Sequence, residues 1–220
     1  MSSSETIRNI YLSLHAAYGN RDWWPAVDGF EVIVGAILTQ NTNWKNVEKA
    51  IKNLKTADVM TPIKLHELPR EQLAELIRPA GYYNIKAARL KNLLDWMVEN
   101  YSAGMESISA LPDWQLREEL LAVKGVGPET ADSIMLYAFN RPIFVVDAYT
   151  ARVFGRHMLI DEYADYHQIQ ELVQSSIEPD LKIYNEFHAL IVEVGKNHCK
   201  PRPKCQGCPL EHLPHQVEEV

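Results

Sequence analysis

The chain of 220 residues lacks any long hydrophobic run. No apolar stretch approaches the ~20 residues that a membrane-spanning helix needs. The N-terminal sequence from Met1 to Glu5 also lacks the apolar core of a signal peptide. Membrane insertion and secretion are therefore not expected. We expect a cytoplasmic protein.

Segments with the two-residue alternation of a half-buried strand are missing as well. Apolar residues recur instead at helical spacing, with capping residues such as Ser4 before them and stop signals such as Gly19 after them. The expected fold class is all-α, and the length allows two lobes that share a core. Helices are predicted at 4–18, 28–40, 43–54, 62–66, 69–78, 85–101, 113–123, 128–139, 148–158, 166–176 and 181–196.

Positive charge is in short supply, since 22 Lys and Arg against 29 Asp and Glu give a net charge of −7. Binding to nucleic acid normally requires a basic face, so such a function would depend on local charge. A candidate cluster consists of Arg78, Lys86, Arg89, Lys91 and Lys124. A charge run on a helix is more often a solvated face.

Cysteine is also rare, and all three cysteines lie within ten residues, at Cys199, Cys205 and Cys208. An odd number of cysteines in a cytoplasmic chain makes disulfides a poor interpretation. Metal ligation fits better, with His212 or His215 as a candidate fourth ligand. Two other polar residues, His188 and Glu193, do not share the i, i+4 face of a simple metal pair and are interpreted as structural or pocket-rim residues.

A glycine hairpin separates two of the predicted helices. The sequence Gly125-Val126-Gly127 follows the helix at 113–123, and Pro128 occupies the first position of the next helix. Glycines let backbone N–H groups approach a ligand closely, and the N-terminus of the second helix favours an anion such as a phosphate. The alternative is an ordinary turn between two packed helices.

Asp147 ends the short apolar run from Ile143 to Val146 and precedes the helix predicted at 148–158. It therefore stands at a helix N-cap, a role that aspartate fills well. From the pattern alone, capping and catalysis are equally good explanations of this residue.

Three motifs together resemble a known family. Lys124–Gly127, Thr130–Asp132 and Val145–Asp147 are similar to the helix-hairpin-helix, Gly/Pro-rich, aspartate (HhH-GPD) superfamily of DNA glycosylases, whose best-known branch is endonuclease III. Leu38–Thr42 resembles the segment that fills the hole left by a flipped base. The cysteine tail resembles the family's iron–sulfur loop, so the resemblance covers nearly the whole chain.

The resemblance implies a two-lobed HhH-GPD DNA glycosylase fold. Residues 21–141 would form a six-helix barrel, and residues 1–20 with 142–220 a second helical lobe that ends in the cysteine loop. The implied partner is double-stranded DNA with damaged bases. We expect a monomer that associates with the nucleoid if the cell is prokaryotic.

The resemblance also assigns roles to single residues. Gln40 would be the wedge, the side chain that enters the duplex and fills the space of the flipped base. Alternatively, it is only a polar residue at the end of the helix 28–40. Asp147 would stabilise the sugar cation and activate water. Glu129 stands where bifunctional members carry a lysine and cannot form a Schiff base, which implies a monofunctional enzyme; a glutamate in a first turn is also stabilised by the helix dipole. Lys124, Gly125, Val126 and Gly127 would contact DNA phosphate.

Two tryptophans are candidates for the base pocket, Trp24 and Trp44, because aromatic faces stack on bases and attract cationic methylated purines. Their sequence context, with Arg78–Ala87, is similar to the 3-methyladenine DNA glycosylase III branch. Alternatively, the tryptophans pack in a core. The alternative functions are an endonuclease III-like glycosylase and AP lyase for oxidised pyrimidines or mismatched bases, and a non-catalytic DNA-binding module.

For the cysteines, the resemblance implies a [4Fe–4S] cluster. The family's fourth cysteine would fall at Pro214, between His212 and His215. A Cys3His zinc site and a loop without metal remain as alternatives.

Overall fold

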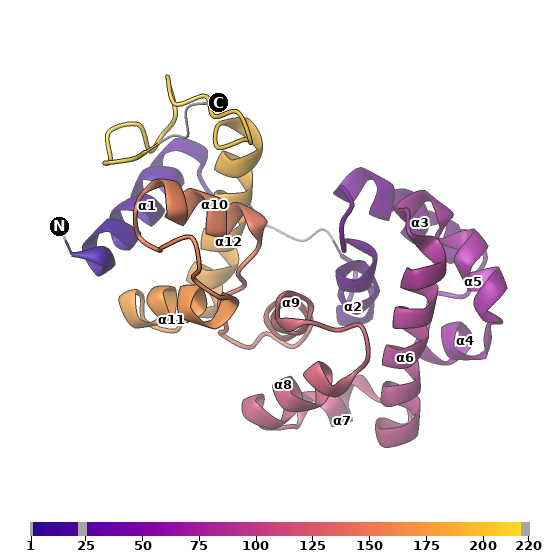
Figure 1. Cartoon of the computed structure of the whole chain (residues 1–220). Helices are drawn as coiled ribbons and strands as arrows, with labels where there is room; N and C mark the ends of the chain where they lie inside the picture. Colours follow the sequence, from indigo (N-terminus) through magenta and orange to yellow (C-terminus); the bar gives the residue numbers. More distant parts are fainter. Residues whose placement is uncertain (1, 22–25, 217–220) are drawn as a thin grey trace. The chain divides into compact units, whose positions relative to one another are not determined.

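The computed structural model describes residues 2–21 and 26–216, and within these ranges it consists of α-helices and one short 3-10 helix (Figure 1). No strand occurs in the described part of the chain. The expected all-α fold class is thereby confirmed. The chain divides into two compact units, Ala26–Arg141 and Met1–Pro25 with Pro142–Val220.

The unit Ala26–Arg141 is organised around α2, which is buried along its length after Gly29. α2 packs on α9, α6 and α3, while α4 and α5 pack on α6. Gly29 permits the approach of α2 to α9, because a Cβ atom there would lie 3.0 Å from the carbonyl oxygen of Ala138. The elements of this unit are α2 (Gly29–Leu38), α3 (Trp44–Thr56), α4 (Pro62–Glu67), α5 (Arg70–Leu76), η1 (Arg78–Ala80), α6 (Tyr83–Tyr101), α7 (Met105–Ser109), α8 (Asp113–Ala122) and α9 (Pro128–Ala138).

The unit formed by the two ends of the chain has α12 at its centre, packed against α10 and α1, while α1 also packs on α11. Its core is aromatic: the ring of Phe187 lies 5.5 Å from those of Tyr11 and Phe144. After α12 the chain forms no helix, but buried Leu210 and Leu213 anchor it. The helices are α1 (Ser3–Tyr18), α10 (Ala148–Arg156), α11 (Tyr166–Ser176) and α12 (Leu181–Asn197).

Helix ends follow local chemistry closely. Ser2 and Glu5 form a capping box at α1, and Asp165 with Gln168 forms another at α11. The helix predicted at 28–40 ends earlier, at Leu38, which frees Gln40 from the helix. α7 and η1 were not expected, because elements of five and three residues are too short to show a period.

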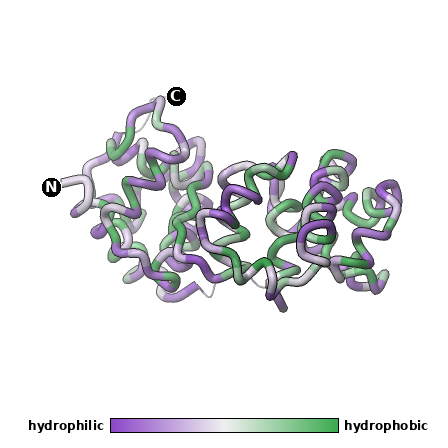
Figure 2. The backbone as a smooth tube through the Cα atoms, turned by 90° about the horizontal axis from the view of Figure 1, so that it is seen from below, coloured by the Kyte–Doolittle hydropathy of each residue, from purple (hydrophilic) through white to green (hydrophobic). Residues whose placement is uncertain are grey.

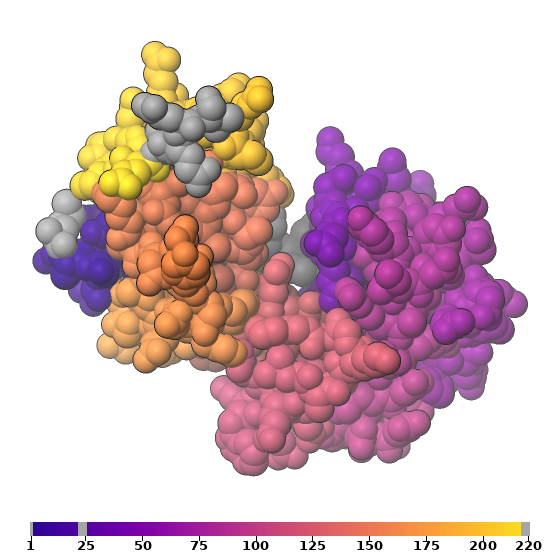
Figure 3. Space-filling view, viewed as in Figure 1, coloured from indigo at the N-terminus to yellow at the C-terminus, as the bar shows by residue number. Residues whose placement is uncertain are grey.

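Hydrophobic and hydrophilic segments alternate along the backbone in both units (Figure 2). Within residues 2–21 and 26–216, no helix is both long and apolar enough to cross a membrane. The C-terminal segment forms part of the surface of its own unit, coloured yellow in Figure 3.

Candidate active site

The glycine hairpin lies between α8 and α9, where the sequence predicts it. Val126 donates its backbone N–H to the carbonyl of Val123, and Pro128 begins α9 directly after Gly127. Gly125 has a φ of +99°, and a Cβ atom there would collide with the side chain of Arg89. Position 125 therefore requires glycine for two reasons, which are its backbone conformation and the close approach of Arg89 on α6.

Gln40 is tied to this hairpin. Its Nε2 donates to the carbonyl of Gly125 at 3.1 Å and to Oγ1 of Thr130 at 3.0 Å. Its Oε1 accepts a hydrogen bond from Nη1 of Arg89 at 2.6 Å. The residue predicted as the wedge is thus held beside the residues predicted to bind phosphate, all within one unit.

Two lysines of the basic cluster predicted from the sequence, Lys86 and Lys91, donate to backbone carbonyls of the protein instead of forming part of a solvated basic surface. Lys86 is buried, and its Nζ donates to the carbonyls of Leu38 and Ala80, so it caps the C-terminus of α2. Burial, with a smaller contribution from Arg89, lowers the pKa of Lys86 to about 8. Lys91 similarly donates to backbone carbonyls of α4. A spacing argument could not separate solvated lysines from lysines that cap buried carbonyls.

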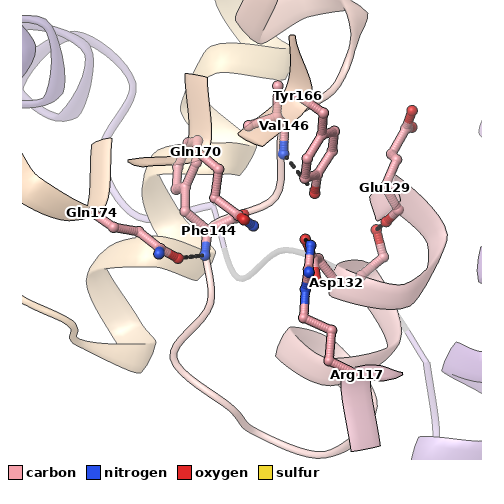
Figure 4. A network of polar contacts seen from close by, with 9 residues as sticks. Arg117, Glu129, Asp132, Phe144, Val146, Tyr166, Gln170 and Gln174 are labelled. Carbon is pink, nitrogen blue, oxygen red and sulfur yellow. Dashed lines mark hydrogen bonds and ion pairs between the residues drawn. The ribbon is translucent and has the colours of Figure 1, made fainter. Parts of the chain in front are cut away.

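Lys124 and Glu129 are both exposed at the hairpin. Glu129 lies in the first turn of α9, where the helix dipole stabilises its charge. One turn later, the fully buried carboxylate of Asp132 forms a bidentate ion pair with Arg117 of α8, at 2.7 and 3.0 Å (Figure 4). This pair holds the two helices of the hairpin motif together.

Asp147 caps α10, as its position in the sequence predicts. Oδ1 accepts hydrogen bonds from the backbone N–H of Thr150 at 2.8 Å and from its Oγ1 at 2.9 Å. Oδ2 lies 3.6 Å from Nε2 of His188 on α12. Burial raises the pKa of Asp147, but His188 and Thr150 together lower it by more than burial raises it. The pKa of Asp147 therefore lies below its ordinary value.

Side chains of α11 hold the extended segment that leads to Asp147. Oε1 of Gln174 accepts a hydrogen bond from the backbone N–H of Phe144 at 3.0 Å, and the hydroxyl of Tyr166 accepts one from Val146 at 3.4 Å (Figure 4). Nε2 of Gln170 donates to the carbonyl of Phe144 at 2.7 Å. The backbone that carries the carboxylate is therefore fixed without pairing in a sheet.

Sequence reasoning missed the partners of these residues. Thr150 was within reach, because an N-cap aspartate bonds the third helical residue. His188 stands 41 positions beyond Asp147 in the sequence, and only its presence among the apolar residues of α12 signalled a buried polar group. Nothing in the sequence indicated which group it would contact.

Of the two tryptophans predicted for the base pocket, Trp24 lies outside the described residues. Trp44 is half-buried at the first position of α3, after the capping residue Asn43. The pocket formed by the two stays a prediction.

The three cysteines line one small cavity of about 30 Å³, together with side chains that include His157 and His215. The residues present do not match a four-cysteine cluster. Pro214 holds the fourth place, and its carbonyl accepts a hydrogen bond from Nδ1 of His157. In the part of the chain that is described, no group of three or more His, Cys, Asp or Glu is arranged to hold a metal ion.

The two histidines proposed as a fourth ligand have other neighbours. Nε2 of His212 lies 3.4 Å from the hydroxyl of Ser13 on α1, and Nδ1 of His215 lies 2.8 Å from the carbonyl of Leu213. The guanidinium of Arg156 donates to Sγ of Cys199 at 3.2 Å and to the carbonyls of Lys200 and Pro201. Hydrogen bonds from α10 therefore support the loop, and the cluster stays a prediction.

Comparison with known proteins identifies the family. Residues 34–179 match the model of the HhH-GPD superfamily base excision DNA repair protein. A protein of Methanocaldococcus jannaschii, provisionally assigned as a DNA repair glycosylase, is 51% identical over 95% of this chain and 96% of its own.

Two solved structures are similar over most of their length. The H. pylori 3-methyladenine DNA glycosylase bound to 1,N6-ethenoadenine has a TM-score of 0.74 and 31% identity, over 89% of this chain and 98% of that one. A non-covalent endonuclease III-DNA complex has a TM-score of 0.82 and 25% identity, over 97% and 95% of the two chains. The chain therefore belongs to the HhH-GPD superfamily of base excision DNA repair proteins, as a DNA glycosylase whose partner is DNA.

Proposed function

We propose that the chain is a monofunctional DNA glycosylase that hydrolyses the N-glycosidic bond of alkylated purines of the 3-methyladenine type. The observation that carries the proposal is the Asp147 carboxylate, whose Oδ1 is committed to Thr150 and whose pKa stays low despite burial. Glu129, in the first turn of α9, supplies no amine for a Schiff base.

The unit Ala26–Arg141 supplies DNA binding in this proposal, as the six-helix barrel expected at 21–141. The backbone N–H groups of Gly125 and Gly127 and the exposed Lys124 bind a phosphate without reading sequence, while the N–H of Val126 closes the turn onto Val123. A base in a duplex must be rotated out before chemistry, at a cost of a few kcal/mol. Gln40 fills the space that the base leaves, and Trp44 with Trp24 stacks on the flipped base.

The chemical step breaks the bond between C1′ and the base nitrogen, and the electron pair leaves with the base. The carboxylate of Asp147 stabilises the positive charge that develops on the sugar. A water oxygen then bonds to C1′ and gives its proton to Asp147. The product is a free base and an abasic site in an intact strand.

The proposed substrate class, alkylated purines, is supported by the positive charge that such bases carry. A 3-methylated adenine already carries a positive charge in DNA, so it departs as a neutral base without protonation by the protein. Indole faces attract such a cation. The likeness to the H. pylori 3-methyladenine DNA glycosylase supports this class, and the likeness to endonuclease III supports the alternative, a glycosylase and AP lyase for oxidised pyrimidines or mismatched bases.

The test uses end-labelled duplexes with a methylated purine, thymine glycol or a mismatched thymine, each resolved with and without hot alkali. Breaks on the methylated duplex that require alkali support the proposal. Breaks without alkali on thymine glycol support the lyase alternative, and DNA binding without release of any base supports a non-catalytic module. Size-exclusion chromatography tests the monomer that we propose.

A further inference from the structure

We infer that His188 is a positioning residue for base release, which holds the Asp147 carboxylate ionised and fixes the direction of its Oδ2. The inference rests on the proposed function, because it assigns His188 a role only through Asp147. The two residues belong to one unit, on α12 and at the start of α10.

The first support is the division of labour within the carboxylate. Oδ1 serves both bonds to Thr150, so capping of α10 does not use Oδ2. Oδ2 lies 3.6 Å from Nε2 of His188, and the two side chains are only 12% and 7% exposed. His188 therefore acts on the oxygen that capping leaves available for chemistry.

The second support is the packing that fixes the position of His188. Gly195 lies seven residues after His188, on the same face of α12. A Cβ atom at Gly195 would collide with the ring of Tyr149 on α10, so this ring packs directly on the backbone of α12. Arg152 of α10 also donates to the carbonyl of Cys199 at 2.6 Å, beyond the end of α12. These contacts set the register that brings His188 to Asp147.

The third support is electrostatic. Burial alone favours the protonated form of a carboxyl group. A protonated Asp147 could neither stabilise a sugar cation nor accept the proton of the attacking water. An imidazole N–H, and more strongly an imidazolium, opposes protonation by interacting with the charged form.

Three other ionisable groups on α10, α11 and α12 contact residues other than Asp147. Arg152 lies over the ring of Tyr149 at 5.1 Å, Glu193 pairs with Arg21, and the hydroxyl of Tyr166 accepts from the backbone of Val146. The contact of α12 with Oδ2 is made by His188.

The experiment compares His188→Ala and His188→Gln with the wild type in single-turnover release of a methylated purine, from pH 5 to 9. Affinity for a duplex with a stable abasic analogue and thermal unfolding are measured in parallel. Tyr184→Phe is the matched control, because it removes the hydrogen bond from the same helix to the carbonyl of Ile177 and does not involve Asp147. Asp147→Asn is assayed beside them.

We expect His188→Ala to slow base release by roughly tenfold or more, less than the loss of an acid–base group itself, with unchanged affinity for DNA. Its rate falls off at a higher pH on the acid side, because Asp147 then protonates more easily. His188→Gln regains most of the rate at neutral pH, since its amide also donates a hydrogen bond, and its rate falls off at a pH between those of the wild type and His188→Ala. Tyr184→Phe changes the melting temperature alone.

The inference is overturned if a folded His188→Ala protein releases the base at the wild-type rate and loses activity at the same acidic pH as the wild type, that is, with an unshifted acid limb of its pH–rate profile. If that variant does not fold, an unshifted acid limb in His188→Gln overturns it equally. When either result accompanies an inactive Asp147→Asn protein, the proposed function stands and only the role of His188 fails. An Asp147→Asn protein that releases bases at the wild-type rate defeats the proposed function and this inference together.

Discussion

The side-chain amide of Gln40 donates a hydrogen bond to the carbonyl of Gly125, 85 residues later in the chain, at 3.1 Å. The segment after α2 and the turn before α9 are thereby joined, and Arg89 of α6 completes the contact through Oε1 of Gln40. A residue expected to move into DNA is thus held in place by the element expected to grip the DNA backbone.

Replacing Gln40 with alanine is predicted to impair both stability and base release. Loss of its hydrogen bonds costs about 1–3 kcal/mol in the free energy of unfolding. Loss of the wedge slows release of the base, because the flipped state is no longer supported. Urea unfolding and single-turnover kinetics measure the two effects.

The matched control for that variant is Gln115→Ala, which removes a glutamine that bonds Glu119 within α8. It is expected to release bases at the wild-type rate. A Gln40→Ala protein with normal kinetics would remove Gln40 from the mechanism and leave it a purely structural residue.

Substituting Gly125 with alanine is predicted to destabilise the hairpin. The φ of +99° is unfavourable for alanine, and the new Cβ atom collides with Arg89. Backbone strain of this kind costs about 1–3 kcal/mol, and the displaced hairpin binds duplex DNA more weakly. Chemical unfolding and fluorescence anisotropy are the measurements.

Gly127→Ala is the stability control for that position, because a Cβ atom at Gly127 meets nothing within 4 Å. Its free energy of unfolding is expected to stay close to the wild-type value. Equal stability losses at the two positions would contradict the strain argument.

Much of the fold could be predicted from the sequence, because its signals are local. Helical spacing and caps gave α11 at Tyr166–Ser176 as expected, and placed Asp147 at the start of α10. The hairpin followed from its glycines and Pro128. These features depend on residues within a few positions of one another.

The long-range contacts could not be predicted in this way. Lys86 is spaced like a solvated lysine, yet it caps α2 across 48 residues. His188 reaches Asp147 only because α12 and α10 pack closely at Gly195. Sequence spacing on one helix carries no information about the helix that will cover it.

Introducing a lysine in place of Glu129 is predicted to create lyase activity. The position is exposed in the first turn of α9, so the side chain fits, at a cost of about 0.3–1 kcal/mol because a positive charge opposes the helix dipole. Its amine can attack C1′ and form a Schiff base. Borohydride trapping on an abasic duplex measures the covalent complex.

Glu118→Lys, at an exposed position on α8, introduces the same charge change away from the hairpin and should give no trapped complex. Efficient trapping by the wild-type protein would instead show that another amine performs this chemistry. The monofunctional assignment would then be wrong.

Removing the guanidinium of Arg156 is predicted to loosen the cysteine loop. Its hydrogen bonds to the carbonyls of Lys200 and Pro201, at 2.6 and 3.0 Å, are made by a charged donor. The Arg156→Ala variant should therefore lose about 2 kcal/mol in its free energy of unfolding. The segment that follows α12 should become sensitive to proteolysis. Unfolding and limited proteolysis test this, with iron and zinc content measured on the same samples.

Arg202→Ala, at an exposed position on the same loop, is the control and should retain wild-type stability. Because Arg156 donates to two backbone carbonyls as well as to Sγ of Cys199, most of its effect should persist after treatment with a chelator. A difference that disappears with the chelator would show that a metal, rather than Arg156, holds the loop.

Changing Asp147 to asparagine is predicted to separate binding and folding from catalysis. Asparagine caps helices as well as aspartate, so α10 should remain intact and DNA binding should persist. Base release should fall by roughly a hundredfold or more, because the amide carries no charge and accepts no proton.

The same variant tests the lowered pKa of Asp147. A carboxyl group whose pKa is lower in the folded state stabilises the fold above its unfolded pKa of about 3.9. That contribution is lost as the pH falls through the folded pKa. The wild-type protein should therefore lose stability as the pH falls below about 5, by an increment that Asp147→Asn lacks, as measured by urea unfolding at each pH. Parallel curves for the two proteins would mean that the carboxylate gains nothing from Thr150 and His188.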